Sequence, residues 1–348
     1  MRATLLAGAM HAERLTAQML AGEPADDPVQ VTRRLLAVQG QDQRGARLAI
    51  RARSTGLTVA DVDRALTDDR SLLITWCNRG TLHLLASEDY PWLHALTAPR
   101  LFTGNARRLA EEGVTASGAE RGVAAIERSL AQEGPLSRAQ LRERISAAGV
   151  PTEGQALVHL LMLACLRGLA VRGPMRDGQH CYALVHDWLG EPQPVDRELA
   201  LAELARRYLA GHAPADDRDL AKWAGLALRD ARAGLSAIAS ELYERDDGLL
   251  ELVRRTAAAP LPPPRLLGAY EPVLLGWCSR AGVVGAEQRR LVTVNGLFRP
   301  FAMVDGRAVA VWKLAAGEVV LEPFAHIARR DQTALRDDAR DVLRFLAA

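Results

Sequence analysis

The chain has 348 residues, of which 49% are hydrophobic and 25% are charged. This length and composition exclude a disordered chain and are typical of a globular protein with two or three compact units. The formal net charge of +2 excludes a uniformly basic protein, although acidic residues elsewhere can balance one basic face. Lys222 and Lys313 are the only lysines among 44 basic residues, so arginine carries nearly all of the positive charge.

The four cysteines are far apart and form no Cys-x-x-Cys pair, so we expect them to be reduced and buried. No His-x-x-x-His or mixed His/Cys spacing indicates a zinc site, and we expect neither a metal nor a cofactor. No window is long and apolar enough to span a bilayer, and the N-terminus has no long apolar segment. The sequence therefore predicts a cytoplasmic protein with no membrane partner.

The first part of the chain predicts short helices followed by a hairpin. Apolar residues at helical spacing predict three helices, over 28–38, 48–53 and 59–66. Two strands joined by a tight turn follow, over 72–76 and 81–85.

The same order of elements occurs twice more. In the second segment, predicted helices contain Val123 to Leu130 and begin at Ser137 and at Thr152, before a hairpin over 169–184. The third segment predicts helices over 199–208, 219–223 and 228–238, and a hairpin over 242–253. Helices followed by a hairpin are the order of a winged helix-turn-helix unit.

A proline-rich linker over 260–264 precedes the last segment. The predicted strands of this segment cover 273–275, 291–294, 298–304, 308–312 and 319–323, and a helix over 331–346 closes the chain. The predicted fold class is therefore α+β: three tandem winged helix-turn-helix units, a small β-rich C-terminal unit and a terminal helix. The predicted boundaries are 1–96 with an N-terminal helix, 97–192, 193–259 and 260–348.

A basic segment surrounds the sequence Gln39-Gly40-Gln41-Asp42, in which Asp42 is the only acid between Arg33 and Arg53. A coding bias explains most of the overall arginine count, but the local clustering needs its own explanation. Two amides at i and i+2 can hold a water or a base edge beside bound phosphates, and neither amide can ionise. Chemistry at this segment must therefore proceed without a strong base.

Four motifs in this order resemble the winged-helix DNA-binding family that contains the AlkZ and YcaQ bacterial DNA glycosylases. The motifs are Leu36-Ala37-Val38-Gln39-Gly40-Gln41-Asp42, Trp76-Cys77-Asn78-Arg79-Gly80-Thr81-Leu82-His83-Leu84, Asp219-Leu220-Ala221-Lys222-Trp223-Ala224-Gly225-Leu226 and Asn295-Gly296-Leu297-Phe298-Arg299-Pro300. Each motif is weak alone, whereas their order and spacing are specific, and the resemblance covers nearly the whole chain.

This resemblance implies three winged helices curved around duplex DNA and a catalytic Gln-x-Gln, which Gln39 and Gln41 would supply. It also implies excision of bulky alkylated purines, unhooking of interstrand crosslinks, and in some members self-resistance of producers of DNA-alkylating antibiotics. Gly40 departs from the usual small-to-aliphatic middle residue and loosens the backbone. Gln41 replaces the carboxylate of the YcaQ-like branch, so the chain sides with the AlkZ-like branch.

Two glutamines suit the excision of a 7-alkylated purine. Such a base is already cationic, so its glycosidic bond breaks without a general acid and needs a positioned water and fixed dipoles. The alternative is that both side chains only cap a helix and bind water. Within a helix, Gln39 and Gln41 would lie roughly 200° apart, so both can serve one site only if the helix ends between them. Asp42 is either a base or an N-cap.

Several cationic and polar side chains are candidates for supporting roles. Arg44, Arg47 and Arg51 share one predicted helix face, which either contacts phosphates or forms a solvated stripe. The predicted DNA-binding residues are Arg33, Arg34, Arg44, Arg47, Arg51, Arg53 and Arg79. His83 is either structural or a catalytic support, and Trp76 is predicted to lie in the core.

The sequence thus predicts a monofunctional DNA glycosylase, a monomer that binds double-stranded DNA and hydrolyses the N-glycosyl bond of alkylated purines. The alternative is a non-catalytic winged-helix DNA-binding protein or transcriptional regulator. A regulator usually dimerises to read a palindrome, and no coiled-coil heptads are present for that. A weaker alternative is a degenerate scaffold that binds protein.

Overall fold

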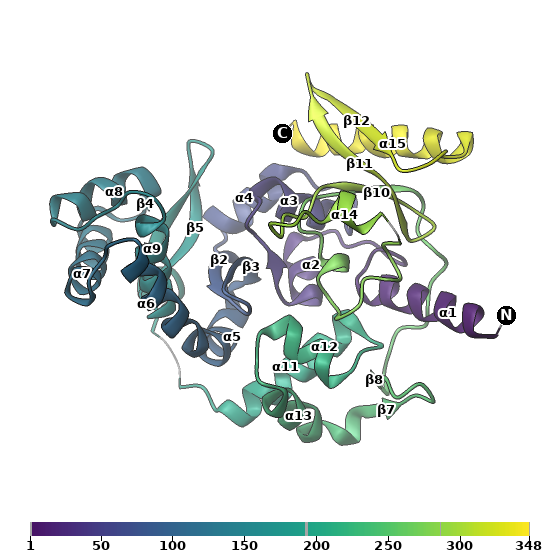
Figure 1. Cartoon of the computed structure of the whole chain (residues 1–348), viewed down its shortest axis with the longest axis horizontal. Helices are drawn as coiled ribbons and strands as arrows, with labels where there is room; N and C mark the ends of the chain where they lie inside the picture. Colours follow the sequence, from purple (N-terminus) through teal and green to yellow (C-terminus); the bar gives the residue numbers. More distant parts are fainter. Residues whose placement is uncertain (1, 192–193, 286, 348) are drawn as a thin grey trace. The chain divides into compact units, whose positions relative to one another are not determined.

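The computed structural model describes residues 2–191, 194–285 and 287–347 of the chain. The chain forms two compact units, which Figure 1 shows coloured along the sequence. The first comprises Met1–Val62 and Leu201–Ala348, and the second comprises Asp63–Ala200. The first unit is therefore built from both ends of the chain, and the second is inserted between them.

The second unit combines an antiparallel sheet, which contains two hairpins, with a group of helices. Its helices are α5 (Tyr90–Thr97), α6 (Phe102–Glu111), α7 (Ala116–Glu133), α8 (Arg138–Ala147), α9 (Ala156–Leu166) and α10 (Val185–Leu189). Its strands are β2 (Leu72–Cys77), β3 (Thr81–Ala86), β4 (Leu136–Ser137), β5 (Ala170–Arg176) and β6 (Gln179–Leu184), in the sheet order β3-β2-β5-β6-β4. The hairpins predicted over 72–85 and 169–184 are confirmed.

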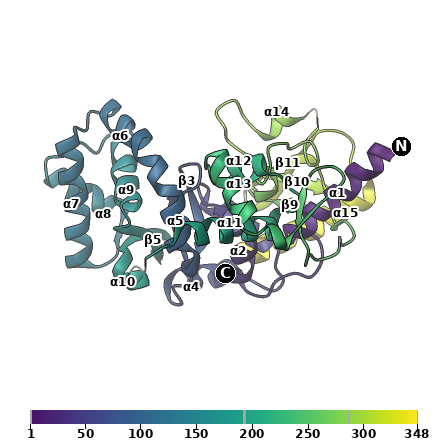
Figure 2. The same cartoon turned by 90° about the horizontal axis from the view of Figure 1, so that it is seen from below.

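Local sequence signals explain how these helices begin and end. Ser137 forms a capping box with Gln140 at the start of α8, which satisfies backbone donors that the helix itself cannot pair. Gly134, at φ 74°, ends α7. Helices α7, α8 and α9 lie side by side (Figure 2), and their apolar faces bury Ile126, Leu141 and Leu160 in one core. Trp76 belongs to the same core, as predicted.

The first unit contains helices from both the N-terminal and the C-terminal parts of the chain. They are α1 (Arg2–Ala17), α2 (Pro28–Leu35), α3 (Gln43–Arg51), α12 (Asp217–Ala224), α13 (Leu228–Ala237), α14 (Gln288–Leu291) and α15 (Arg329–Leu346). Two helices, α4 (Val59–Thr67) and α11 (Arg197–His212), contain the residues at which the units divide. Asp27 caps α2 by accepting a bond from the Val29 amide, and Pro28 occupies its first turn.

The strands of the first unit form one antiparallel sheet and one small hairpin. The sheet order is β12-β11-β10-β9, formed by Glu318–Pro323, Arg307–Ala315, Phe301–Val304 and Arg265–Leu267. The hairpin joins β7 (Leu242–Glu244) to β8 (Leu250–Leu252), as predicted, and β1 is the short strand Val38–Gln39. Helix α15 packs against β9, beside the sheet in both views (Figures 1 and 2).

Two predicted strands are wrong, and so is the prediction that Cys278 is buried. The run 273–275 lies in a short 3₁₀ helix, Pro272–Leu274, because Glu271 caps it and Pro272 occupies its first turn. The run 291–294 ends α14 and leaves only a single bridge between Val292 and Phe298. Cys278 is exposed, whereas Cys77, Cys165 and Cys181 are buried. The mixed α and β content that we predicted is confirmed.

Candidate active site

Gln39 and Gln41 lie immediately before α3, outside any helix. Gln39 ends β1 and Gln41 occupies the bend that follows, so neither residue is helical. The Gln39 Nε2 atom donates a hydrogen bond to the Gln41 Oε1 atom at 2.5 Å. The structure therefore brings the two amides together, with Gln39 buried and Gln41 exposed.

Asp42 is the N-cap of α3, which confirms one of the two interpretations of this residue. Its Oδ1 atom accepts a hydrogen bond from the Gly45 amide at 2.5 Å. The cap fixes the first turn of α3 directly after the glutamines. A helix N-terminus also carries partial positive charge, which a carboxylate offsets. A catalytic role for Asp42 remains a prediction.

Two glycines allow a second segment to approach this turn closely. A Cβ atom on Gly45 would collide with the carbonyl oxygen of Ala269, and one on Gly268 would lie 2.9 Å from the Gly45 Cα atom. Only glycine fits both positions without displacing backbone. The chain after β9 therefore packs directly on the first turn of α3, and Tyr270 is the next residue along it.

Arg51 holds α3 against α15 and β9. Its guanidinium pairs with Asp338 at 2.5 Å and Asp341 at 2.7 Å, and it donates to the Leu266 carbonyl at 3.3 Å. The Leu266 amide in turn donates to Asp338 at 2.6 Å. Because every nitrogen of this side chain is engaged and only 3% of it is exposed, the predicted phosphate contact of Arg51 is wrong.

Arg53 is a second internal anchor. Its Nη2 atom pairs with Glu271 at 2.5 Å, and neither side chain is exposed. Its other nitrogens donate to the carbonyls of Gln18 and Ala49. A buried charge needs such compensation, since an unpaired one would cost several kcal/mol. The predicted DNA contact of Arg53 is therefore also wrong.

The remaining arginines of the basic segment differ in exposure. Arg47 is buried and donates to the Gln43 carbonyl at 3.2 Å, so the predicted exposed stripe does not include it. Helix α3 contacts α2, β9 and α15, which explains why its basic face is covered. Arg33 and Arg44 are exposed. Their phosphate contacts remain predictions.

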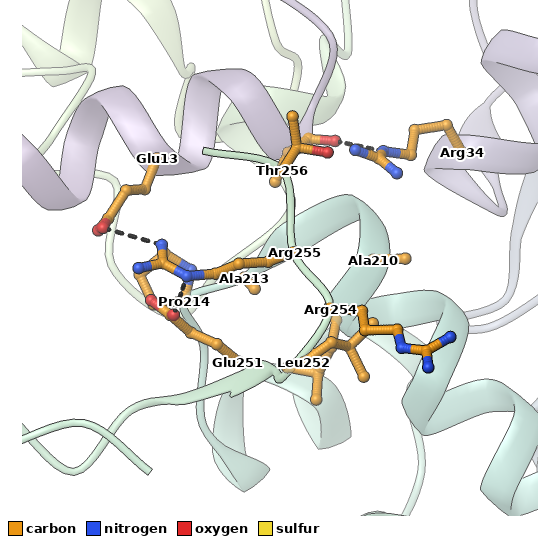
Figure 3. Close-up of a pocket in the computed structure, with 12 residues that line it drawn as sticks. Glu13, Arg34, Ala210, Ala213, Pro214, Glu251, Leu252, Arg254, Arg255 and Thr256 are labelled. Carbon is orange, nitrogen blue, oxygen red and sulfur yellow. Dashed lines mark hydrogen bonds and ion pairs between the residues drawn. The ribbon is translucent and has the colours of Figure 1, made fainter. Parts of the chain in front are cut away.

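Arg34 lies at the edge of a pocket in the first unit (Figure 3). Its Nε atom donates to the Ala17 carbonyl at 3.0 Å, and burial lowers its pKa from the ordinary value of arginine. Across the pocket, Arg255 pairs with Glu13 at 3.1 Å and with Glu251 at 2.7 Å. Acidic partners thus offset part of the positive charge of this pocket.

Two predicted site residues belong to the second unit. His83 is buried in β3, and its Nδ1 atom lies 2.9 Å from the Thr81 carbonyl oxygen. Burial, with the nearby charge of Arg79, lowers the pKa of His83 to about 3. A histidine held neutral at physiological pH favours the structural interpretation. Arg79 is half-buried in the turn between β2 and β3.

Tyr270 and the anchoring acids Asp338 and Asp341 of α15 are not among the site residues predicted from the sequence, and Phe298 was predicted only as part of a motif. The Tyr270 and Phe298 ring centroids are 5.7 Å apart, and Phe298 also faces the Arg280 guanidinium at 5.1 Å. The spacing of Asp338 and Asp341, one turn apart on a helix, was an available signal for a shared partner. No local pattern marks Tyr270. Among the residues the structure describes, no cluster of three or more His, Cys, Asp or Glu residues could hold a metal ion, and no helix is long and apolar enough to cross a membrane.

Comparisons with known proteins identify relatives of the whole chain. The family described as DNA glycosylase AlkZ-like matches residues 32–345. An interstrand DNA cross-link repair glycosylase of Streptomyces sahachiroi is 29% identical over 358 aligned residues, which cover 95% of this chain and 94% of the relative. The solved structure of the Streptomyces sahachiroi DNA glycosylase AlkZ superimposes with a TM-score of 0.78 at 24% identity, over 97% of this chain and 96% of that one. That likeness shows a shared fold.

Proposed function

Because the chain belongs to the AlkZ-like DNA glycosylase family, whose members hydrolyse N-glycosyl bonds, we propose that it excises N-alkylated purines of the 7-alkylguanine type from duplex DNA. The observation that carries this proposal is the hydrogen-bonded pair of Gln39 and Gln41. The relative's name concerns interstrand cross-links, and we extend that activity to this chain as part of the same proposal. Unhooking a cross-link uses the same bond cleavage at each tethered purine.

In the proposed mechanism the glutamines position a water for attack at the sugar C1′ atom. The bond from Gln39 orients the Gln41 amide, and the Asp42 cap fixes the backbone beneath it. An alkylated purine leaves as a neutral base because it begins as a cation, so no proton donor is required. Preorganised dipoles that face the developing oxocarbenium ion lower the barrier by several kcal/mol.

The proposed DNA interface consists of three winged-helix units over 1–96, 97–192 and 193–259, with their hairpins as wings, followed by the β-rich unit over 260–348. One observation favours a repair enzyme over a sequence-specific regulator. Nine of the eleven residues of α9, the helix that a reading unit would place in the major groove, are buried. A buried helix cannot contact base edges well, as sequence-specific recognition needs. Recognition of a damaged base does not require a helix in the major groove.

Replacement of the glutamines tests the mechanism. Gln39→Ala and Gln41→Ala should each slow single-turnover excision of 7-methylguanine by about 100-fold, the scale of losing one preorganised polar contact. Gln43→Ala is the matched control, because this exposed amide of α3 lies two residues further along. Gln41→Asp should retain more activity than Gln41→Ala, since a carboxylate still orients water and stabilises a cationic sugar.

Duplex affinity and thermal melting should stay near the parental values in these variants. Parental excision rates in both alanine variants would overturn the glutamine mechanism, and Asp42 would then be the next residue to change. Absence of abasic sites in a 7-methylguanine duplex treated with the parental protein would overturn the proposed substrate class.

A further inference from the structure

Tyr270 has a backbone conformation that its side chain disfavours. Its φ angle is 55°, in the left-handed region that residues other than glycine, asparagine and aspartate rarely adopt. Such strain persists only where the surrounding structure imposes it, and it is concentrated at functional sites. The strained residue directly follows Gly268 and Ala269, which pack on the first turn of α3.

The chain on both sides of Tyr270 is fixed by buried contacts. Upstream, Leu266 is bonded to Arg51 and Asp338, and the Leu267 carbonyl accepts a bond from the Trp312 ring nitrogen at 2.9 Å. Downstream, Glu271 forms the fully buried ion pair with Arg53. The anchors leave Tyr270 little freedom, so its ring position is set by the first unit as a whole.

These anchors place the backbone that leads into Tyr270 on the first turn of α3. Gly268 and Ala269 pack against Gly45 in the first turn of α3, three residues after Asp42. The negative charge of Asp42 acts on the Tyr270 hydroxyl, whose pKa is raised by burial and by that charge. Tyr270 is half-buried, so part of the residue faces solvent.

Phe298 extends the same aromatic surface. Its ring is tilted by 41° from that of Tyr270, and Arg280 covers it at 5.1 Å while donating from Nε to the Leu274 carbonyl. A tilted pair presents one ring of the two to a flat ligand. Arg280 covers one face of Phe298, so Tyr270 is the ring of this pair that has no arginine recorded over it among the residues that the structure describes.

We propose that Tyr270 is a stacking site for the cationic nucleobase of the lesion, with Asp42 supplying complementary negative charge. This inference rests on the proposed function and names the residue that recognises its substrate. A positively charged base gains from the face of an aromatic ring in a way that a neutral base of the same shape does not. Tyr270 thereby distinguishes alkylated from ordinary purines at the stage of binding.

Binding of two matched duplexes tests the inference independently of turnover. One carries 7-methylguanine with a 2′-fluorine that blocks excision, and the other carries the neutral isostere 7-methyl-7-deazaguanine. The parental protein should bind the cationic duplex about tenfold more tightly. Tyr270→Phe should keep that preference, and Tyr270→Asn should abolish it. Asparagine suits a positive φ, so this variant removes the ring without adding backbone strain.

Tyr243→Asn is the matched control for the loss of an exposed tyrosine. Tyr243 lies in the proposed wing β7–β8, so its loss acts equally on both duplexes and should leave the ratio of the two affinities unchanged. A preference retained by Tyr270→Asn would overturn the proposal. Loss of the preference in Tyr270→Phe as well would also overturn it, because the hydroxyl rather than the ring would then be responsible. If the parental protein prefers the cationic duplex yet excises no 7-methylguanine, the stacking site stands and the proposed function fails.

Discussion

His83 shows at the residue scale how burial limits the chemistry of a side chain. Its pKa is about 3 in the folded protein, against an ordinary value of 6.5, because burial and Arg79 disfavour the charged ring. In the unfolded chain His83 therefore binds a proton below about pH 6.5. In the folded protein it binds that proton only near pH 3. Folding stability is lost as the pH falls through this window.

We predict that lowering the pH from 7 to 5 removes about 2 kcal/mol of stability through His83 alone. Urea unfolding of the parental protein and of His83→Gln at both pH values measures this contribution. The glutamine variant cannot titrate, so its stability should fall by about that much less. Identical pH dependence in the two proteins would show that His83 is protonated without penalty.

At the scale of secondary-structure elements, α3 is held by a salt-bridge network rather than exposed as a basic stripe. Asp338 and Asp341 of α15 both pair with Arg51, yet their exposure differs: 13% for Asp338 and 42% for Asp341. Asp338 also accepts the Leu266 amide, so it joins three elements. The two acids provide a matched comparison on one helix.

Asp338→Asn should destabilise the protein by about 3 kcal/mol, because it leaves a buried guanidinium with one partner fewer. Asp341→Asn should cost about 1 kcal/mol or less, since solvent screens that pair. Chemical denaturation of both variants measures the difference. Equal losses would contradict the assignment of Asp338 as the main anchor.

At the scale of the whole molecule, burial of Arg51 and Arg53 removes two residues from the expected DNA interface. The exposed residues Arg33 and Arg44 remain candidates for phosphate contact, whereas Arg51 and Arg53 are structural. Each phosphate contact releases a counterion, so affinity for duplex DNA should fall steeply with salt.

Arg44→Ala should reduce the log–log salt slope of duplex binding by roughly one unit. Arg330→Ala is the control for the loss of one charge, because this arginine of α15 is 81% exposed. Fluorescence anisotropy over a range of salt concentrations gives both slopes. A slope that Arg44→Ala leaves unchanged would remove Arg44 from the interface.

The sequence by itself determined most of the local elements and indicated Gln39 and Gln41 as candidates. Capping signals such as Ser137 and the hairpin turns act over a few residues, so they could be recognised without the fold, and the motif order identified the family. The sequence does not decide whether the Gln39 and Gln41 side chains meet, because a helix and a strand orient residues i and i+2 differently; the structure shows their hydrogen bond.

Only the tertiary structure decided the roles of the arginines and the position of Tyr270. Arg51 meets Asp338 across 287 residues, and Arg53 meets Glu271 across 218. A helix face that looks basic and exposed in the sequence becomes internal when three other elements pack on it. Burial depends on such distant partners, and neither periodicity nor spacing within one segment can reveal them.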